Sequence, residues 1–262
     1  SQSILILASY KALYHYSWCE QLIVTAEIKE VFIRQVLEPH TEKNLKFDIP
    51  TLKEITDKTS LKVRTQYEKS PYPRWVQLRL RWQPSSIYDF VGESQIKLVD
   101  EKISLVEKPE VLIAGCGTGQ HSIEVAAKFK CSKLLAMDLS LSSLCYAKRK
   151  TDELGIQNIN YMQGDILDLG KLGKQYDIVE SAGVLHHMDN PMAGWKVITD
   201  CLKQGGLMKI GLYSEVARKH IVKMRQEISN LGIGSSDNEI KSYRKMVMDS
   251  GKTHHNKILK SS

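Results

Sequence analysis

Residues 111–120 constrain the fold of this chain more than any other stretch. The apolar run 111–114 predicts a buried strand, and it leads directly into three glycines at alternate positions. These are Gly115, Gly117 and Gly119. Residues 122–130 then place apolar side chains at helical spacing. A strand, a glycine turn and a helix are typical of the first unit of a nucleotide-binding α/β fold, because glycine lets the backbone approach a ligand and adopt unusual φ angles.

The spacing of the glycines helps to distinguish between ligands. The dinucleotide fingerprint places its third glycine six positions into the motif. Counted from Gly115, that position is Gln120, and here the third glycine comes one residue earlier. The resulting G-x-G-x-G pattern resembles motif I of the class I S-adenosylmethionine-dependent methyltransferases. The resemblance implies S-adenosylmethionine as cofactor and a Rossmann-like, mostly parallel sheet with flanking helices.

The resemblance extends over residues 108–213. Further strands are predicted at 133–138, 159–163, 176–181 and 206–213, and the turn before the last strand is similar to the family's L-K-x-G-G turn. In the family, an acid at the end of the second strand grips the ribose hydroxyls, and one after the third strand holds the adenine amine. The resemblance implies these roles for Asp138 and Asp165. The other cofactor-binding residues that it implies are Ala114, Gly115, Cys116, Gly117, Gly119, Leu139, Ile166 and Ser181.

Each of these assignments has a structural alternative. The glycines also fit tight turns in a ligand-free α/β protein, and Asp138 and Asp165 also fit helix N-caps, where Asp is common. We favour cofactor binding because five motifs follow one another in family order. One position departs from the family pattern. Many members carry an acid two residues before the first glycine, where it helps to orient the amino end of the cofactor, and this chain has Ile113 there.

The segment after the predicted fourth strand, 181–188, is expected to face the methyl acceptor. Methyl transfer depends mainly on aligning the acceptor for in-line attack, and a base is needed only if the acceptor must lose a proton. His186 and His187 are the candidate catalytic residues, because imidazole titrates near neutrality. Their alternative roles are to cap a helix that starts near Pro191 or to bond to backbone. Weaker candidates for acceptor contacts are Tyr213, Glu215 and Arg218.

The acceptor itself is not indicated by any motif. The chain has no D/N-P-P-Y/F sequence, no Pro-Cys pair and no double-glutamate loop, since Glu180 stands alone. A small molecule, an RNA and a protein all remain open as acceptors. Two other functions also remain open: a non-catalytic, cofactor-binding interaction module, and an NAD-dependent oxidoreductase, against which Gln120 counts.

Composition limits the remaining classes. The chain has 262 residues, 42% of them hydrophobic, and a formal charge of +7. No run approaches the ~20 apolar residues of a membrane span, so no membrane contact is expected. The five cysteines show no metal-ligand spacing, which favours reduced thiols, a cytoplasmic location and no bound metal. The positive charge permits an acidic partner, and the oligomeric state is not indicated. A first residue Ser rather than Met is expected of a processed chain or a fragment.

Four segments are predicted along the chain. They are a helical N-terminal segment at 1–65, a Pro/aromatic lid or linker at 66–107, the cofactor-binding domain at 108–230 and a basic tail at 231–262. Within the first segment, apolar spacing predicts a helix over 4–38 that Pro39 stops, and a second helix at 52–58. At the other end, helices are predicted at 215–230 and 239–249, no strand is predicted after Tyr213, and 251–262 is predicted to be disordered.

The strip 66–75 carries two prolines one residue apart, which predict an extended, stiff backbone. It resembles a segment upstream of the methyltransferase domain in bacterial proteins that fuse this domain to tetratricopeptide repeats. We keep two interpretations of the strip. It is either a lid over the cofactor with Arg74 near a carboxylate, or an interdomain linker packed by its aromatic residues.

Overall fold

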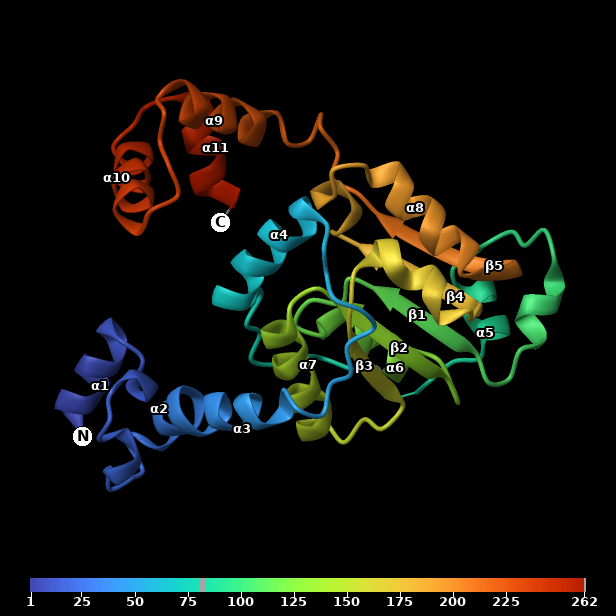
Figure 1. Cartoon of the computed structure of the whole chain (residues 1–262), viewed down its shortest axis with the longest axis horizontal. Coiled ribbons are helices and arrows are strands. Elements are labelled where there is room, and N and C mark those ends of the chain that lie inside the picture. Colours follow the sequence, from blue (N-terminus) through green and yellow to red (C-terminus); the bar gives the residue numbers. More distant parts are fainter. Residues whose placement is uncertain (81–82, 262) are drawn as a thin grey trace. The chain divides into compact units, whose positions relative to one another are not determined.

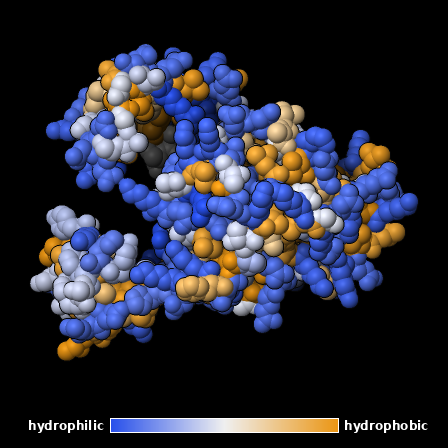
Figure 2. Space-filling view, in the orientation of Figure 1, coloured by the Kyte–Doolittle hydropathy of each residue, from blue (hydrophilic) through white to orange (hydrophobic). Residues whose placement is uncertain are grey.

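The computed structural model describes residues 1–80 and 83–261 (Figure 1). The chain forms two compact units, Ser1–Gly211 and Leu212–Ser262. The division into four segments stays a prediction, and the break between the units falls inside its third segment, 108–230. No helix in the described part of the chain has the length and apolar character needed to cross a membrane. The face seen in Figure 2 is mostly hydrophilic, with small hydrophobic areas among the polar side chains.

Five parallel strands form the sheet of the first unit. They are β1 (Glu110–Ala114), β2 (Lys133–Asp138), β3 (Ile159–Gln163), β4 (Tyr176–Ala182) and β5 (Leu202–Gly211). Their order is β3-β2-β1-β4-β5, so the chain first moves outward from β1 and then returns to its other side. The predicted Rossmann-like parallel sheet is confirmed. Its switch point lies between β1 and β4, where open α/β sheets bind ligands beyond the carboxyl ends of the strands.

Helices cover both faces of the sheet (Figure 1). On one face lie α5 (Ile87–Glu93), α6 (Gln120–Lys128) and α7 (Leu141–Glu153). On the other lie the 3-10 helix η5 (Ile166–Leu172) and α8 (Pro191–Asp200). The predicted helix after the glycine turn is therefore confirmed as α6, and it begins at the end of the loop.

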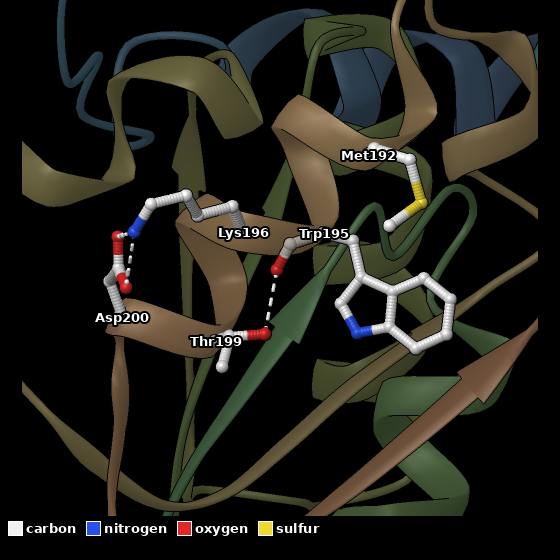
Figure 3. Close-up of a pocket in the computed structure, with 5 residues that line it drawn as sticks. All are labelled: Met192, Trp195, Lys196, Thr199 and Asp200. Atoms are coloured by element: carbon white, nitrogen blue, oxygen red, sulfur yellow. Dashed lines mark hydrogen bonds and ion pairs between the residues drawn. The ribbon is translucent and has the colours of Figure 1, made fainter.

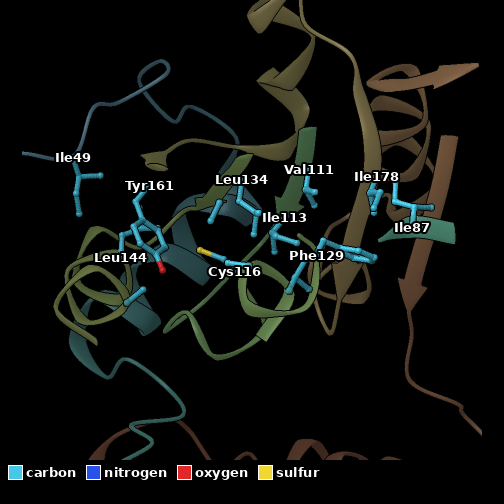
Figure 4. Packing of buried hydrophobic residues seen from close by; sticks show 14 of the residues in the cluster. Ile49, Ile87, Val111, Ile113, Cys116, Phe129, Leu134, Leu144, Tyr161 and Ile178 are labelled. Carbon is cyan, nitrogen blue, oxygen red and sulfur yellow. The ribbon is translucent and has the colours of Figure 1, made fainter. Parts of the chain in front are cut away.

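The apolar run of β1 is buried on both sides. Successive side chains of a strand point to opposite faces, so Val111 and Ile113 join the cluster under α6 and α7 (Figure 4). Leu112 and Ala114 join the cluster under η5 and α8. All four side chains have 0% exposure. A continuous apolar run is what a central parallel strand requires, and it fixes the position from which the glycine loop emerges.

The N-terminal segment is helical, as predicted, but in several pieces. They are α1 (Gln2–Tyr10), η1 (Leu13–His15), η2 (Cys19–Gln21), α2 (Lys29–Phe32), the π-helix η3 (Ile33–Leu37), α3 (Glu38–Leu45) and α4 (Lys58–Lys69). A single helix over 4–38 was therefore a wrong prediction. Pro39 does not stop the helix either, because it lies in the first turn of α3, directly after the π-helical turn. Proline lacks an N–H and would break a regular α-helix at this point. Because the π-helical turn changes the hydrogen-bond pattern there, Pro39 is tolerated.

Residues 52–58 were expected to be helical, but of these only Lys58, the first residue of α4, is helical. This segment follows a short parallel bridge between Thr51 and Gln163 at the outer edge of β3. The backbone N–H of Leu52 donates to the Gln163 carbonyl at 2.8 Å, and the N–H of Gln163 donates to the Pro50 carbonyl at 2.8 Å. Helix α4 begins only after Asp57, whose carboxylate accepts from the Ser60 N–H at 2.8 Å. The N-cap residue Asp57 is therefore a better local signal for the start of this helix than the apolar spacing.

The connector before β1 is partly helical, as predicted, with α5 and η4 (Glu101–Leu105). Residues 81–82 of the predicted lid or linker lie outside the described residues.

The second unit consists of α9 (Lys219–Asn230), α10 (Asp237–Met248) and α11 (Thr253–Ser261). In the described residues no strand follows β5, as predicted. Disorder over 251–262 was a wrong prediction for residues 253–261, because α11 packs against α9; residue 262 is outside the described range.

Candidate functional site

The glycine loop turns sharply at the carboxyl end of β1. The N–H groups of Gly115 and Cys116 donate to the Met137 carbonyl at 2.8 and 2.9 Å, which ties the loop to the end of β2. All three glycines have positive φ angles, +82° at Gly115, +53° at Gly117 and +85° at Gly119. The loop ends at Gly119, which is the N-cap residue of α6. Side-chain-bearing residues are disfavoured at such angles, so the backbone alone requires glycine at each position.

The space around the three glycines separates their roles. A Cβ atom on Gly115 would lie 2.4 Å from the Val184 side chain, and one on Gly119 would lie 2.5 Å from Cβ of Ala147. Beside Gly117 the nearest atom to such a Cβ is the Tyr72 carbonyl oxygen, at 3.9 Å. Gly115 and Gly119 thus permit close packing within the protein, as the tight-turn alternative expects. Gly117 is the position where the loop leaves room beside the backbone.

Asp138 ends β2 and faces this loop. Its carboxylate accepts from the Gly117 N–H at 2.8 Å and from the Ser140 N–H at 2.9 Å. The N-cap of α7 is Ser140, not Asp138. Burial is the main reason that the pKa of Asp138 is raised, while its backbone hydrogen bonds oppose that rise. The structure therefore brings together the predicted residues Gly117 and Asp138.

A second carboxylate, which the sequence did not indicate, lies near Asp138. Glu68 at the end of α4 accepts from the Leu141 N–H at 2.5 Å and from the Ser142 hydroxyl at 2.6 Å. It thereby caps the first turn of α7, and its charge contributes to the raised pKa of Asp138. Glu68 precedes Leu141 by 73 residues, so no local pattern could have revealed the contact. Helix α4 is thus held beside the predicted ribose-binding acid.

Asp165 adopts the capping role that was its alternative. Its carboxylate accepts from the Leu167 N–H at 3.0 Å and caps η5. Both Asp165 and Ile166 are buried. The Leu139 carbonyl accepts from Nε2 of Gln163 at 3.0 Å. These three predicted residues lie at the carboxyl ends of β2 and β3, and no interaction among them distinguishes a cofactor site from a purely structural arrangement.

The remaining predicted contacts are also part of the buried frame. The Ser181 hydroxyl donates to the Ala114 carbonyl at 2.9 Å, which joins β4 to the end of β1 at the switch point. Cys116 is buried, and burial is the main cause that raises the pKa of its thiol. A neutral thiol is a poor nucleophile, so burial counts against a nucleophilic role for Cys116.

Residues 66–69 of the strip belong to α4, so the extended backbone predicted over 66–75 is wrong there. The rest of the strip packs on the glycine loop. Nε1 of Trp75 donates to the Thr118 carbonyl at 3.0 Å, and the Thr118 hydroxyl donates to the Pro73 carbonyl at 2.6 Å. The Tyr146 hydroxyl of α7 donates to the Trp75 carbonyl. The strip is therefore bonded to the loop on one side and to α7 on the other, which fits both a lid and a linker packed by its aromatic residues.

Arg74 does not extend toward the loop. Its guanidinium pairs with Glu42 of α3 at 3.1 Å and lies 4.8 Å from the centre of the Tyr146 ring. The carboxylate that we expected near Arg74 is thus a protein side chain. Arg149 on α7 pairs with the same Glu42 at 3.0 Å. These contacts fasten the strip to α3 and α7.

The two histidines lie in η6 (Leu185–His187), directly after β4. Both are half-buried, and their ring centroids are 4.3 Å apart. Neither caps α8, because the Asn190 side chain accepts from the Ala193 N–H at 3.1 Å at that helix end. His186 and His187 therefore keep their status as predicted catalytic residues. Of the weaker candidates, Arg218 stacks on Tyr213 at 3.3 Å from the ring centre, within the second unit.

A buried acid–histidine pair lies beside the loop and was not predicted. Oε2 of Glu180 on β4 is 2.7 Å from Nε2 of His121 in the first turn of α6, and 3.4 Å from Nζ of Lys209 on β5. Glu180 is in register with Ile113 on β1. Burial raises the pKa of Glu180, but the His121 hydrogen bond and nearby positive charges together lower it by more. The net pKa is therefore below the ordinary value.

Glu180→Gln is expected to lower the free energy of unfolding by about 1–2 kcal/mol at pH 7, because a charge-assisted hydrogen bond becomes a neutral one. The folded-state pKa is depressed, so this stabilisation is present above the ordinary glutamate pKa of about 4.3 and is lost as the pH falls through the lower folded value. Urea unfolding at pH 7 and near pH 3 measures both effects. The exposed Glu124→Gln on α6 is the control. If the difference in the free energy of unfolding between wild type and Glu180→Gln is larger near pH 3 than at pH 7, this account is contradicted.

A shallow groove runs along the outer side of α8 (Figure 3). It is lined by Met192, Trp195, Lys196, Thr199 and Asp200. The Lys196 ammonium is paired with the Asp200 carboxylate at 2.8 Å, and the Thr199 hydroxyl donates to the Trp195 carbonyl at 2.8 Å. The polar groups of the groove thus bond to one another, and none of the predicted site residues lines it.

Comparison with known proteins agrees with this geometry. Residues 111–206 match the model of a methyltransferase domain. This match supports a methyltransferase domain in that part of the chain. The match begins at the first residue of the apolar run in β1 and ends in β5, so it spans the sheet and the glycine loop.

Similar proteins match this chain over different shares of their length. An uncharacterised protein of Synechococcus is 30% identical over 58% of this chain and 34% of its own length. Malonyl-[acyl-carrier protein] O-methyltransferase 1 of Ilyobacter polytropus is 28% identical over 61% of this chain and 57% of its own length. The solved magnesium protoporphyrin IX methyltransferase of Synechocystis, with bound cofactor, has 22% identity and a TM-score of 0.39, covering 58% of this chain and 75% of that one. The chain spans well under two-thirds of the two curated relatives.

Proposed function

We propose that this chain transfers the methyl group of S-adenosylmethionine to an acceptor. The observation that carries the proposal is the contact between Gly117 and Asp138 at the switch point of the sheet. There a loop backbone with room beside it meets a half-buried carboxylate at 2.8 Å. The methyltransferase domain match over 111–206 covers both residues.

The residues around this contact fit the chemical groups of the cofactor. A carboxylate with two acceptor oxygens, such as Asp138, suits a ribose diol. The N-terminus of α6 has no side-chain cap and no acidic residue in its first turn. Its backbone N–H groups suit the cofactor's amino-acid carboxylate, because helix N-termini attract anions. We assign the adenine amine to Asp165, whose carboxylate accepts from the Leu167 N–H through Oδ1.

Glu180 is our candidate for the acid that is missing at Ile113. It is in register with Ile113 on the neighbouring strand, and it bonds to His121, the more exposed partner at 24% against 5%. We propose that this pair orients the amino-acid end of the cofactor. The Glu180→Gln variant also tests this role. It is expected to bind S-adenosylhomocysteine more weakly and 5′-methylthioadenosine, which lacks that end, as well as wild type does. An equal change for both ligands would exclude the role.

Bound S-adenosylmethionine supplies an electrophilic methyl on a sulfonium, so the protein's task is alignment of the acceptor. We assign that task to the segment after β4, which leaves the sheet at the switch point. His186 or His187 accepts the acceptor's proton where one must be lost. The strip bonded to Thr118 shields the loop from water.

Asp138→Ala is expected to weaken binding of S-adenosylhomocysteine by about 1.5–3 kcal/mol, the usual range for hydrogen bonds to a charged group. That is about a 10- to 150-fold rise in Kd. Isothermal titration calorimetry measures it, with Asp152→Ala, an exposed acid on α7, as the control. Equal affinities for both variants and wild type would remove Asp138 from the site.

Activity is tested by incubating the chain with S-adenosylmethionine and candidate small molecules, RNA or proteins, and identifying a methylated product by mass spectrometry. Cofactor binding without turnover of any acceptor favours the non-catalytic interaction module. Binding of NAD instead favours an oxidoreductase. The methylated product would identify the acceptor class. A cytoplasmic location and the similarity to repeat-fused methyltransferases are further parts of the proposal.

A further inference from the structure

Three metal-ligating side chains converge in the second unit. Glu227 lies on α9, and His254 and His255 lie on α11, which packs against α9 (Figure 1). Nε2 of His254 is 2.9 Å and Nε2 of His255 is 2.7 Å from the same carboxylate oxygen, Oε2 of Glu227. The three candidate ligand atoms all lie within 4.8 Å of one another.

We propose that Glu227, His254 and His255 bind a divalent transition-metal ion, with zinc the best match. Two imidazoles and one carboxylate form a ligand set that zinc uses when it keeps its fourth position open. Zn–N and Zn–O bonds of about 2.0–2.2 Å place tetrahedral ligand atoms a little over 3 Å apart. The observed separations from Oε2 therefore require only small side-chain adjustments.

The surroundings of the cluster support this assignment. His255 is fully buried, while the side chains of Glu227 and His254 are 13% and 21% exposed, so the site is enclosed but reachable. Lys252 pairs with the other carboxylate oxygen, Oε1 of Glu227. Outer hydrogen bonds of this kind orient metal-binding carboxylates.

The consequence of such a site is a link between metal binding and the docking of α11. The ligands come from two helices, so an ion that binds all three holds α11 on α9. The sequence prediction of no metal relied on cysteine spacing. It could not find this cluster, because Glu227 precedes His254 by 27 residues.

The test is titration of the full chain with ZnSO₄ by calorimetry at neutral pH, together with the visible spectrum of the Co²⁺ form. We expect one zinc per chain and the intense absorption bands of tetrahedral cobalt. Glu227→Gln and His254→Gln should each weaken zinc binding at least about tenfold. The matched control is His220→Gln, a histidine on α9 outside the cluster, which should bind zinc as wild type does.

Three results would overturn the proposal. They are the absence of zinc binding to wild type, unchanged binding in Glu227→Gln and His254→Gln, and an equal loss in His220→Gln, which would indicate scattered surface binding. Far-UV circular dichroism without metal verifies that each variant is folded. If one variant loses helicity, the other variant and the wild-type cobalt spectrum decide, because the bands depend on the ligand geometry of the intact protein.

Discussion

Gly119→Ala is expected to lower the free energy of unfolding by about 2–5 kcal/mol. About 1–2 kcal/mol comes from placing a side chain at a φ of +85°. A further 1–3 kcal/mol comes from overpacking, because the new Cβ would lie 2.5 Å from Cβ and 2.9 Å from Cα of Ala147. That backbone belongs to α7 and cannot move without disturbing the core. Urea denaturation followed by circular dichroism measures the loss.

Gly155→Ala separates the two contributions. Gly155 also has a positive φ, +68°, but nothing lies within 4 Å of the position of its added Cβ. This control should therefore lose only about 1–2 kcal/mol, the backbone cost alone. Equal losses in Gly119→Ala and Gly155→Ala would show that the loop does not pack on α7 as described.

Gly117→Val is expected to reduce S-adenosylhomocysteine affinity by at least about 100-fold, or about 2.7 kcal/mol, while the protein stays folded. The Gly117 position has room for a side chain, since only the Tyr72 carbonyl lies within 4 Å of an added Cβ. In our account that room belongs to the cofactor, so a branched side chain fills it. Calorimetry with S-adenosylhomocysteine measures the affinity, and circular dichroism verifies the fold.

Gly155→Val is the matched control for this variant. Both substitutions place a branched residue at positive φ, so both should lose comparable stability. Only Gly117→Val should lose cofactor affinity, because Gly155 lies after α7, away from the loop. Normal binding by Gly117→Val would show that the cofactor, if bound, does not approach this part of the chain.

The sheet could be predicted from sequence because its signals are local. Each central strand is a short apolar run that is followed by a glycine or ends in an acid. Such a run can be recognised in the sequence without knowledge of the tertiary contacts. The glycine loop and the order of the motifs then fixed the fold class. Even so, the roles of the glycines could not be separated. The difference between Gly117 and Gly119 depends on Ala147 and Tyr72, which are distant in sequence.

Two of the incorrect predictions involve tertiary contacts. Residues 253–261 have a disordered-looking composition, but His254 and His255 bond to Glu227 and the segment folds as α11. The helix expected at 52–58 gave way to pairing with β3 through Gln163. The contact of Glu68 with Leu141 spans 73 residues, and the contact of Glu180 with His121 spans 59 residues. Sequence periodicity therefore could not predict either contact.

The most direct test of the central claim is calorimetry of the wild-type chain with S-adenosylhomocysteine and, separately, with NAD. Our account predicts that one S-adenosylhomocysteine binds per chain and that NAD does not bind. Absence of S-adenosylhomocysteine binding by a folded chain, or binding of NAD in its place, would contradict it.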